Sequence, residues 1–153
     1  MQEVQVESKI IKGIGTRTTN QNEMKPETAK LGALWQTFDK KVPVDYQNGD
    51  RVYGIYYDYE SDANGEFSVL AGFDGAINAD SDLDEVSIEG GKYLRFDATA
   101  KTADDAGRVQ AIIETWGTIW QYFSGKPEYE RAYKTDFEFY KDSTHIEIYI
   151  SIK

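Results

Sequence analysis

The chain has 153 residues, no cysteine, and 27 acidic against 17 basic residues, which gives a formal net charge of −10. The missing cysteine excludes disulfides, thiol catalysis and thiolate metal sites, and is compatible with a reducing compartment. The negative charge disfavours direct binding to nucleic acid and to anionic membranes. A chain of this length is expected to form one domain, here residues 1–153, with about two-thirds of its unfolded surface buried.

The N-terminus has no basic stretch followed by an apolar run, and no segment approaches 18 consecutive apolar residues. We therefore expect a soluble cytoplasmic protein that does not bind membranes. The sequence calls for no cofactor and no metal. Tyr, Phe and Trp together make up 14% of the residues, enough for aromatic walls around a ligand as well as a core.

Two segments carry apolar residues at helical spacing, and each has a tryptophan on its apolar stripe: Trp35 in the first and Trp116 in the second. Segments rich in aromatic and β-branched residues between turn signals indicate strands. In chain order, we expect strands at 4–18 with a break, a helix around 31–42, strands at 51–60, 65–75 and 86–98, a helix around 109–123, and strands at 131–140 and 145–152.

The order strand, helix, hairpin thus occurs twice. It predicts an α+β fold in which an antiparallel sheet and two main helices form pseudo-twofold strand-helix-strand-strand modules. The internal repeat would cover roughly residues 1–77 and 83–153, joined in the acidic stretch 78–85. Two such halves leave a groove between them, which is a common place for a ligand pocket.

Glu138 is the most informative single residue, because it lies in the aromatic segment Thr135-Asp136-Phe137-Glu138-Phe139-Tyr140. A strand alternates its side chains between two faces, and an ordinary exposed position would have small polar neighbours. One interpretation is a carboxylate held among rings for a function. The other is a hydrated glutamate on an open sheet face.

Glu147 lies on the following strand, where it alternates with isoleucines. A hairpin loop with an even number of residues would place Glu147 directly opposite Glu138, whereas an odd number would break this pairing. Two opposed carboxylates repel unless water, a cation or a shared proton intervenes. On this pairing we predict a raised pKa for Glu138.

Segments along almost the whole chain, in their order and spacing, resemble one family, the stand-alone GyrI-like or AraC-type effector-binding domains that bind small molecules and include integron-cassette members. The segments are Gly15-Thr16-Arg17-Thr18-Thr19-Asn20 with Glu23, Leu34-Trp35-x-x-Phe38, Tyr57-Asp58-Tyr59-Glu60, Gly91-Lys92-Tyr93, Trp116-x-x-Ile119-Trp120, Arg131-Ala132-Tyr133-x-x-Asp136-Phe137-Glu138-x-Tyr140 and Glu147-Ile148-Tyr149-Ile150.

The resemblance implies an aromatic pocket at the junction of the two modules, with Glu138 as the anchor for cationic, often aromatic, ligands. It implies a sensor or sequestering module of transcription-regulator type, with a separate regulator protein as a candidate partner. Arg95 departs from the pattern, since it would place a cation near the pocket if its strand face points inward. The site residues implied are Glu138, Glu147 and Tyr149, with Tyr57, Tyr93, Trp35 and Trp116 as weaker candidates.

Two other functions remain open at this stage. A hydrolase of reactive small molecules would use Glu138 to activate water, because paired carboxylates suit acid/base chemistry when their pKa values differ. A protein-interaction module would use sheet edges or aromatic faces. The acidic run 80–84 lacks the glycine and glutamate of a calcium loop, and the single histidine, His145, fits the edge of a turn.

Overall fold

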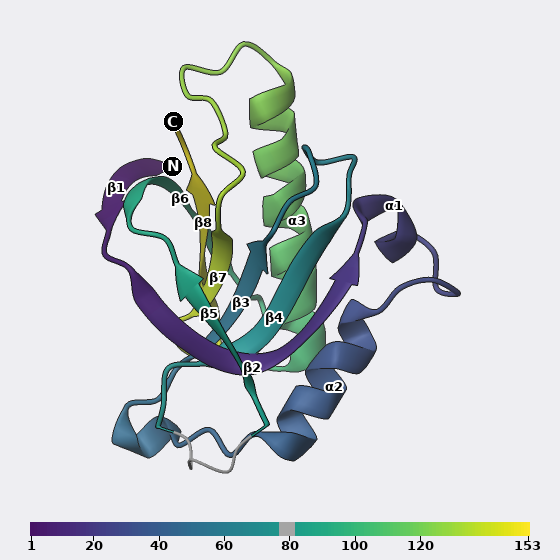
Figure 1. The fold of residues 1–153 in the computed structure, drawn as a ribbon, viewed down its shortest axis with the longest axis vertical. Helices are drawn as coiled ribbons and strands as arrows, with labels where there is room; N and C mark the ends of the chain where they lie inside the picture. The colour runs from purple at the N-terminus through teal and green to yellow at the C-terminus, as the bar shows by residue number, and fades with distance from the viewer. Residues whose placement is uncertain (77–81) are drawn as a thin grey trace.

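The structure, a computed structural model, describes residues 1–76 and 82–153 as one curled antiparallel sheet with helices packed against it (Figure 1). The strands are β1 (Gln2–Val6), β2 (Lys9–Thr18), β3 (Val52–Tyr57), β4 (Phe67–Phe73), β5 (Asp84–Ile88), β6 (Gly91–Thr99), β7 (Asp136–Tyr140) and β8 (His145–Ser151). The helices are α1 (Asn20–Glu23), α2 (Leu31–Lys41), a 3₁₀ turn at Tyr46–Asn48, and α3 (Asp105–Ser124).

The strand order β1-β6-β8-β7-β3-β4-β2-β5 has an internal symmetry. If the order is read from β5 to β1, and β1–β4 are exchanged with β5–β8 in turn (β1 with β5, β2 with β6, and so on), the same order results. The centre of this symmetry is the pair of β3 and β7. The predicted α+β class, with an antiparallel sheet, two main helices and a pseudo-twofold relation, is therefore confirmed. The predicted junction of the repeats falls partly on residues 77–81, which lie outside the described residues.

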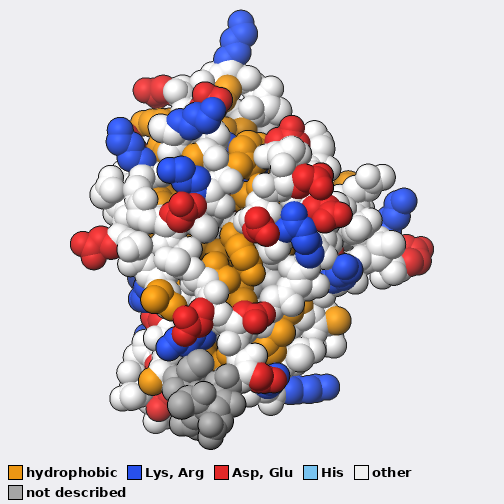
Figure 2. Space-filling model, viewed as in Figure 1, with side chains coloured by type: hydrophobic (Ala, Val, Ile, Leu, Met, Phe, Trp, Pro, Cys, Tyr) orange, Lys and Arg blue, Asp and Glu red, His pale blue; other side chains and the backbone are white. Residues whose placement is uncertain are grey.

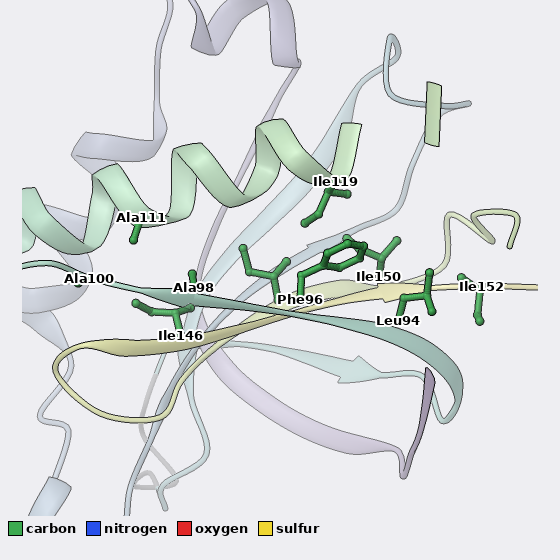
Figure 3. Close-up of a cluster of buried hydrophobic side chains, with 10 residues drawn as sticks. Leu94, Phe96, Ala98, Ala100, Ala111, Ile119, Ile146, Ile150 and Ile152 are labelled. Carbon is green, nitrogen blue, oxygen red and sulfur yellow. The ribbon is translucent and has the colours of Figure 1, made fainter. Parts of the chain in front are cut away.

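Helices α2 and α3 pack on the same face of the sheet, each over its own half. Under α3 lies a cluster that joins Ala111 and Ile119 to buried residues of β6 and β8, which Figure 3 shows in close-up. Under α2, Leu34 and Phe38 pack on β3 and β4. Burial of such side chains contributes roughly 25 cal/mol for each Å² of apolar surface removed from water. Each helix is therefore fixed against the sheet by its own apolar stripe.

Side chains hold the N-termini of both main helices. The Glu23 carboxylate, from α1, accepts hydrogen bonds from the backbone N–H groups of Lys30 (3.0 Å) and Leu31 (3.2 Å) at the start of α2. Asp104 caps α3 by accepting from the backbone N–H of Gly107 at 2.8 Å. Free N–H groups at a helix start need such acceptors, and capping stabilises the helix by about 1 kcal/mol. These hydrogen bonds fix the N-terminal ends of α2 and α3, the helices that carry Trp35 and Trp116.

The opposite face of the sheet carries a third apolar cluster without a helix over it. It contains Tyr53, Tyr93 and Phe137 together with aliphatic residues from both halves. The sheet curls around this face, so that its two edge strands, β1 and β5, both contribute side chains to one hollow there. Both faces of the sheet are thus partly buried. The strand pattern alone did not show which face the helices cover.

Candidate functional site

Glu138 lies at the centre of the sheet, on the face that the helices cover. On β7 it pairs with Gly54 of β3 on one side and with Ile148 of β8 on the other. The residue is only 2% exposed to solvent. A carboxylate in this position has lost its hydration, so its partners within the protein decide its chemistry.

Three neutral donors hold the two oxygens of Glu138. The hydroxyl of Tyr56 (2.7 Å) and the indole Nε1–H of Trp116 (2.9 Å) donate to Oε2, and the hydroxyl of Tyr140 donates to Oε1 at 3.0 Å. No cationic side chain of the described residues forms an ion pair with Glu138. The site is therefore a buried acid surrounded by donors that carry no charge.

Burial raises the pKa of the Glu138 carboxyl, and the three donated hydrogen bonds offset part of that increase. Burial and the neighbouring Glu138 charge also raise the pKa values of Tyr56 and Tyr140 well above the ordinary range. Both phenols thus keep their protons at neutral pH and remain donors. The raised pKa predicted for Glu138 is present, but its cause is burial and not a facing carboxylate.

Trp35 of α2 approaches the same centre from the other helix. Its ring lies edge-on to Tyr140, with centroids 5.6 Å apart. A Cβ atom at Gly54 would lie 3.1 Å from Trp35 and 3.1 Å from Oε1 of Glu138. Glycine at this position therefore lets the Trp35 ring and the carboxylate come together over β3.

The aromatic surround is nearly symmetric, whereas the charge is not. Tyr56 follows Gly54 by two residues on β3, as Tyr140 follows Glu138 by two residues on β7, and both hydroxyls donate to Glu138. The pseudo-twofold centre thus carries one tyrosine from each half but a single carboxylate. A second acid in place of Gly54 would face the first across the strand pair, and like charges in that relation repel.

Comparison with known proteins identifies the family of the chain. The family model for integron-associated effector binding proteins matches residues 4–152. The chain belongs to this family. An integron cassette protein from the mobile metagenome of Vibrio cholerae is 34% identical, with a TM-score of 0.87 over 99% of this chain and 95% of that one. No match is found among curated proteins.

Two more distant structures share the fold of this effector-binding protein. One is described as SAV2435 bound to tetraphenylphosphonium, at 20% identity, with a TM-score of 0.64 over 99% of this chain and 93% of that one. The other is a bacterial transcription regulation protein from Staphylococcus aureus, at 20% identity, with a TM-score of 0.66 over 99% of this chain and 97% of that one. At this identity they show the fold alone.

Of the residues implied by the family resemblance, the structure brings Glu138, Trp116 and Trp35 together. Glu147 and Tyr149 lie on the other face of the sheet, where the Tyr149 hydroxyl donates to Glu147 at 2.8 Å. Tyr57 and Tyr93 belong to the apolar cluster of that face. Arg95 also lies there, beside Glu147 and Asp97, and so places no cation near Glu138.

The predicted pairing of Glu138 with Glu147 is wrong. Tyr140 pairs with Ile146, so five residues, 141–145, separate the paired ends of the hairpin. An odd loop shifts the register by one position, which turns every side chain of β8 to the opposite face. Glu147 therefore lies opposite Phe139, and Glu138 lies opposite an isoleucine.

Sequence reasoning did not select Tyr56, Tyr140 and Gly54 for this candidate site. Tyr140 could have been found, because residues two apart on a strand share a face. Tyr56 and Gly54 required the register between β3 and β7, which are far apart in sequence. Local alternation gives no means of aligning two strands separated by a whole helix and hairpin.

Apolar side chains on α3 continue the aromatic surface toward solvent. Val109, Ile113 and Trp120 are 53%, 59% and 45% exposed, and they lie on the same side of the helix as Trp116. The rings of Trp116 and Trp120 are in contact, with centroids 5.9 Å apart. Exposed apolar groups arranged in this way are typical of a contact surface for a ligand or partner.

No helix of the described residues is long and apolar enough to cross a membrane. The same residues contain no group of three or more His, Asp or Glu arranged to hold a metal ion. The acidic run 80–84 lies partly outside the described residues.

Proposed function

We propose that this protein binds small lipophilic cations over Glu138, between α2 and α3, as a sensor or sequestering module. The observation that carries the proposal is a carboxylate 2% exposed, held by three uncharged donors and without a cationic partner among the described residues. Buried acids are ordinarily paired with a cation. An arriving ligand would supply the positive charge that the protein does not.

The binding energy would combine three contributions. Apolar area contributes roughly 25 cal/mol per Å² buried, each well-placed ring about 0.5 to 2 kcal/mol through cation–π contact, and the charge of Glu138 adds direct attraction. Trp35, Tyr56, Trp116 and Tyr140 supply the rings. Area and rings tolerate many ligand shapes, so such a site would accept a broad range of compounds and discriminate mainly by charge.

The state of the carboxylate favours binding over catalysis. Two carboxylate oxygens offer about four acceptor positions, and three are taken. Donated hydrogen bonds also stabilise the charged form and so offset part of the rise in pKa that burial causes. A general base for water would have to use the one remaining acceptor position, on a side chain that is only 2% exposed.

The similar structure described with tetraphenylphosphonium supports the choice of ligand class, since that ion is apolar, aromatic and positively charged. Family membership supports a role in effector recognition. For this chain we infer a cytoplasmic role in which ligand capture is passed to a separate regulator protein.

The test is a pair of calorimetric titrations, with tetraphenylphosphonium as the cation and triphenylphosphine oxide as a neutral analogue. In Glu138→Gln we expect affinity for the cation to fall by about tenfold or more, which is about 1.4 kcal/mol, because the charge attraction is lost. Affinity for the neutral analogue should change much less.

Glu147→Gln is the matched control, because it removes the same charge from the neighbouring strand on the opposite face. It should leave cation binding within about twofold, because Glu147 lies on the far side of the sheet, with Arg95 3.8 Å away. Equal loss for the cation and the neutral compound in Glu138→Gln, or equal loss in both variants, would contradict the proposal.

A further inference from the structure

A hollow lies on the sheet face opposite Glu138. Its volume is about 290 Å³, and it is lined by apolar and aromatic residues from four strands, with Tyr53 and Lys9 beside them. The apolar lining consists of Val4, Val6, Ile88, Phe137, Phe139 and Tyr149. A hollow of this size with few polar groups has the character of a small-molecule site.

Strand alternation makes this hollow the reverse side of the Glu138 site. Phe137 and Phe139 flank Glu138 on β7, and their side chains point to the other face. Phe137 stacks on Tyr149 with centroids 4.5 Å apart and an interplanar angle of 10°, and Phe139 packs on Tyr53 at 5.1 Å. The hollow therefore has a packed aromatic wall, and no helix of residues 1–76 and 82–153 covers it.

Its polar groups differ from those of the Glu138 site, because they include a lysine. The ammonium of Lys9 donates to the hydroxyl of Tyr53 and to Oδ2 of Asp74, both at 3.1 Å. An ammonium has three N–H donors, so one is left among the described residues. The Lys9 side chain is 47% exposed and is the one cation in the lining, while the one acid there, Glu7, is exposed.

From this placement we infer that the hollow is a second ligand site, for a small molecule with a flat apolar body and a carboxylate. The body would lie on the Phe137, Phe139 and Tyr149 wall, and the carboxylate would accept the remaining N–H of Lys9. Edge strands β1 and β5 close the hollow from two sides. In Figure 2 hydrophobic side chains form a band across the strands, bordered by charged groups, as an amphipathic ligand requires.

The second site is independent of the proposed cation site, and the chain offers a way to observe each one separately. All three tryptophans, Trp35, Trp116 and Trp120, belong to α2 or α3. Tryptophan fluorescence therefore reports on the helix side of the sheet. Amide NMR shifts of the edge strands β1 and β5, which line the hollow, report on the opposite side.

The experiment titrates 2-naphthoate into the full chain, followed by ¹H–¹⁵N NMR, with 2-naphthylmethanol as the uncharged comparison. We expect saturable shifts at Val4, Val6 and Ile88, weaker binding of the alcohol, and no competition with tetraphenylphosphonium measured by fluorescence. Lys9→Met should reduce naphthoate affinity about three- to fivefold, the size expected for a half-exposed charge pair.

Three further variants test whether naphthoate binds in the hollow. Lys12→Met, on the same strand but the opposite sheet face, should not change naphthoate affinity. Glu7→Gln should increase it by removing a repulsive charge, and Val6→Phe should reduce it by filling the hollow from an edge strand. The ¹H–¹⁵N spectrum of each variant checks that the fold is kept.

Several outcomes would overturn the inference. They are the absence of saturable naphthoate binding, shifts confined to α2 and α3, displacement of naphthoate by tetraphenylphosphonium, and equal affinity in wild type and Lys9→Met. None of them depends on whether Glu138 binds cations, since a failed cation titration leaves the naphthoate result interpretable.

Discussion

Asp136 and Glu138 lie two residues apart on the same face of β7, and both are almost fully buried, at 0% and 2% exposure. Their surroundings differ. Asp136 accepts from the guanidinium of Arg131 at 2.7 Å, from the hydroxyl of Tyr59 at 2.5 Å, and from the backbone N–H of Ser151 at 2.8 Å. Glu138 accepts only from two phenols and an indole.

The difference is between an acid with a cationic partner inside the protein and an acid without one among the described residues. At Asp136 the charge is neutralised by Arg131 from the loop before β7, and the same carboxylate is held to the end of β8 by the N–H of Ser151. At Glu138 the same desolvation is left uncompensated by any cation of the described residues. Buried charge without a partner is costly, and this cost is the basis of the proposal that a cationic ligand binds at Glu138.

The largest loss of stability is expected from Arg131→Met, because Asp136 would then be buried without its cationic partner, as Glu138 is. The guanidinium also lies over the ring of Tyr133, at 4.3 Å from the centroid. Removing one partner of a buried pair leaves an uncompensated charge and costs about 3 to 5 kcal/mol. We expect this loss in the free energy of unfolding measured with urea.

Lys153→Met is the control for Arg131→Met, because the Lys153–Glu130 pair is 62% and 74% exposed. An exposed pair contributes at most about 1 kcal/mol. If both variants lose the same small amount, Asp136 does not depend on its ion pair and the contrast with Glu138 fails.

A smaller loss of stability is expected from Tyr56→Phe and Tyr140→Phe, which leave Glu138 with fewer hydrogen-bond donors. Each removes one donated hydrogen bond and should cost about 1 to 2 kcal/mol of stability. Because donors lower the pKa of Glu138, removing one should raise it further. Carboxyl ¹³C NMR titration would measure this pKa.

Tyr46→Phe serves as the control for these two variants, since Tyr46 is 58% exposed and is not one of the three donors to Glu138. A Glu138 pKa that stays constant in both Tyr56→Phe and Tyr140→Phe would show that the phenols do not set the charge state of the acid.

The smallest effect is expected in the pH dependence of Glu138→Gln. The ordinary value for this carboxyl is 4.5, and burial raises its pKa in the folded protein. Below pH 4.5 both folded and unfolded chains hold the proton, whereas above it the unfolded chain releases the proton first. Ionisation of Glu138 therefore lowers the stability of the wild type as pH rises through the folded pKa.

Glutamine in place of Glu138 removes this loss. The stability of Glu138→Gln relative to wild type should therefore increase from acidic to neutral pH, measured by urea unfolding at a series of pH values. A constant difference across that range would show that the folded and unfolded pKa values of Glu138 are equal.

Much of the fold was predictable from the sequence. Helical periodicity located α2 and α3 with their tryptophans, and the repeated order of elements predicted the pseudo-twofold antiparallel sheet. Glu138 was selected from its own neighbours, since an acid between aromatic residues on a strand is unusual. These features depend on residues close together in the chain, where backbone geometry dictates which side chains share a face.

Only the tertiary structure decided which side chains share the site with Glu138. One extra residue in the loop 141–145 moved Glu147 and Tyr149 to the reverse face, and the β3–β7 register brought Gly54 and Tyr56 to Glu138. Registers depend on loop conformation and on packing between distant segments, which local alternation does not encode. The sequence alone thus determined the acid and the fold around it, whereas long-range pairing determined its partners.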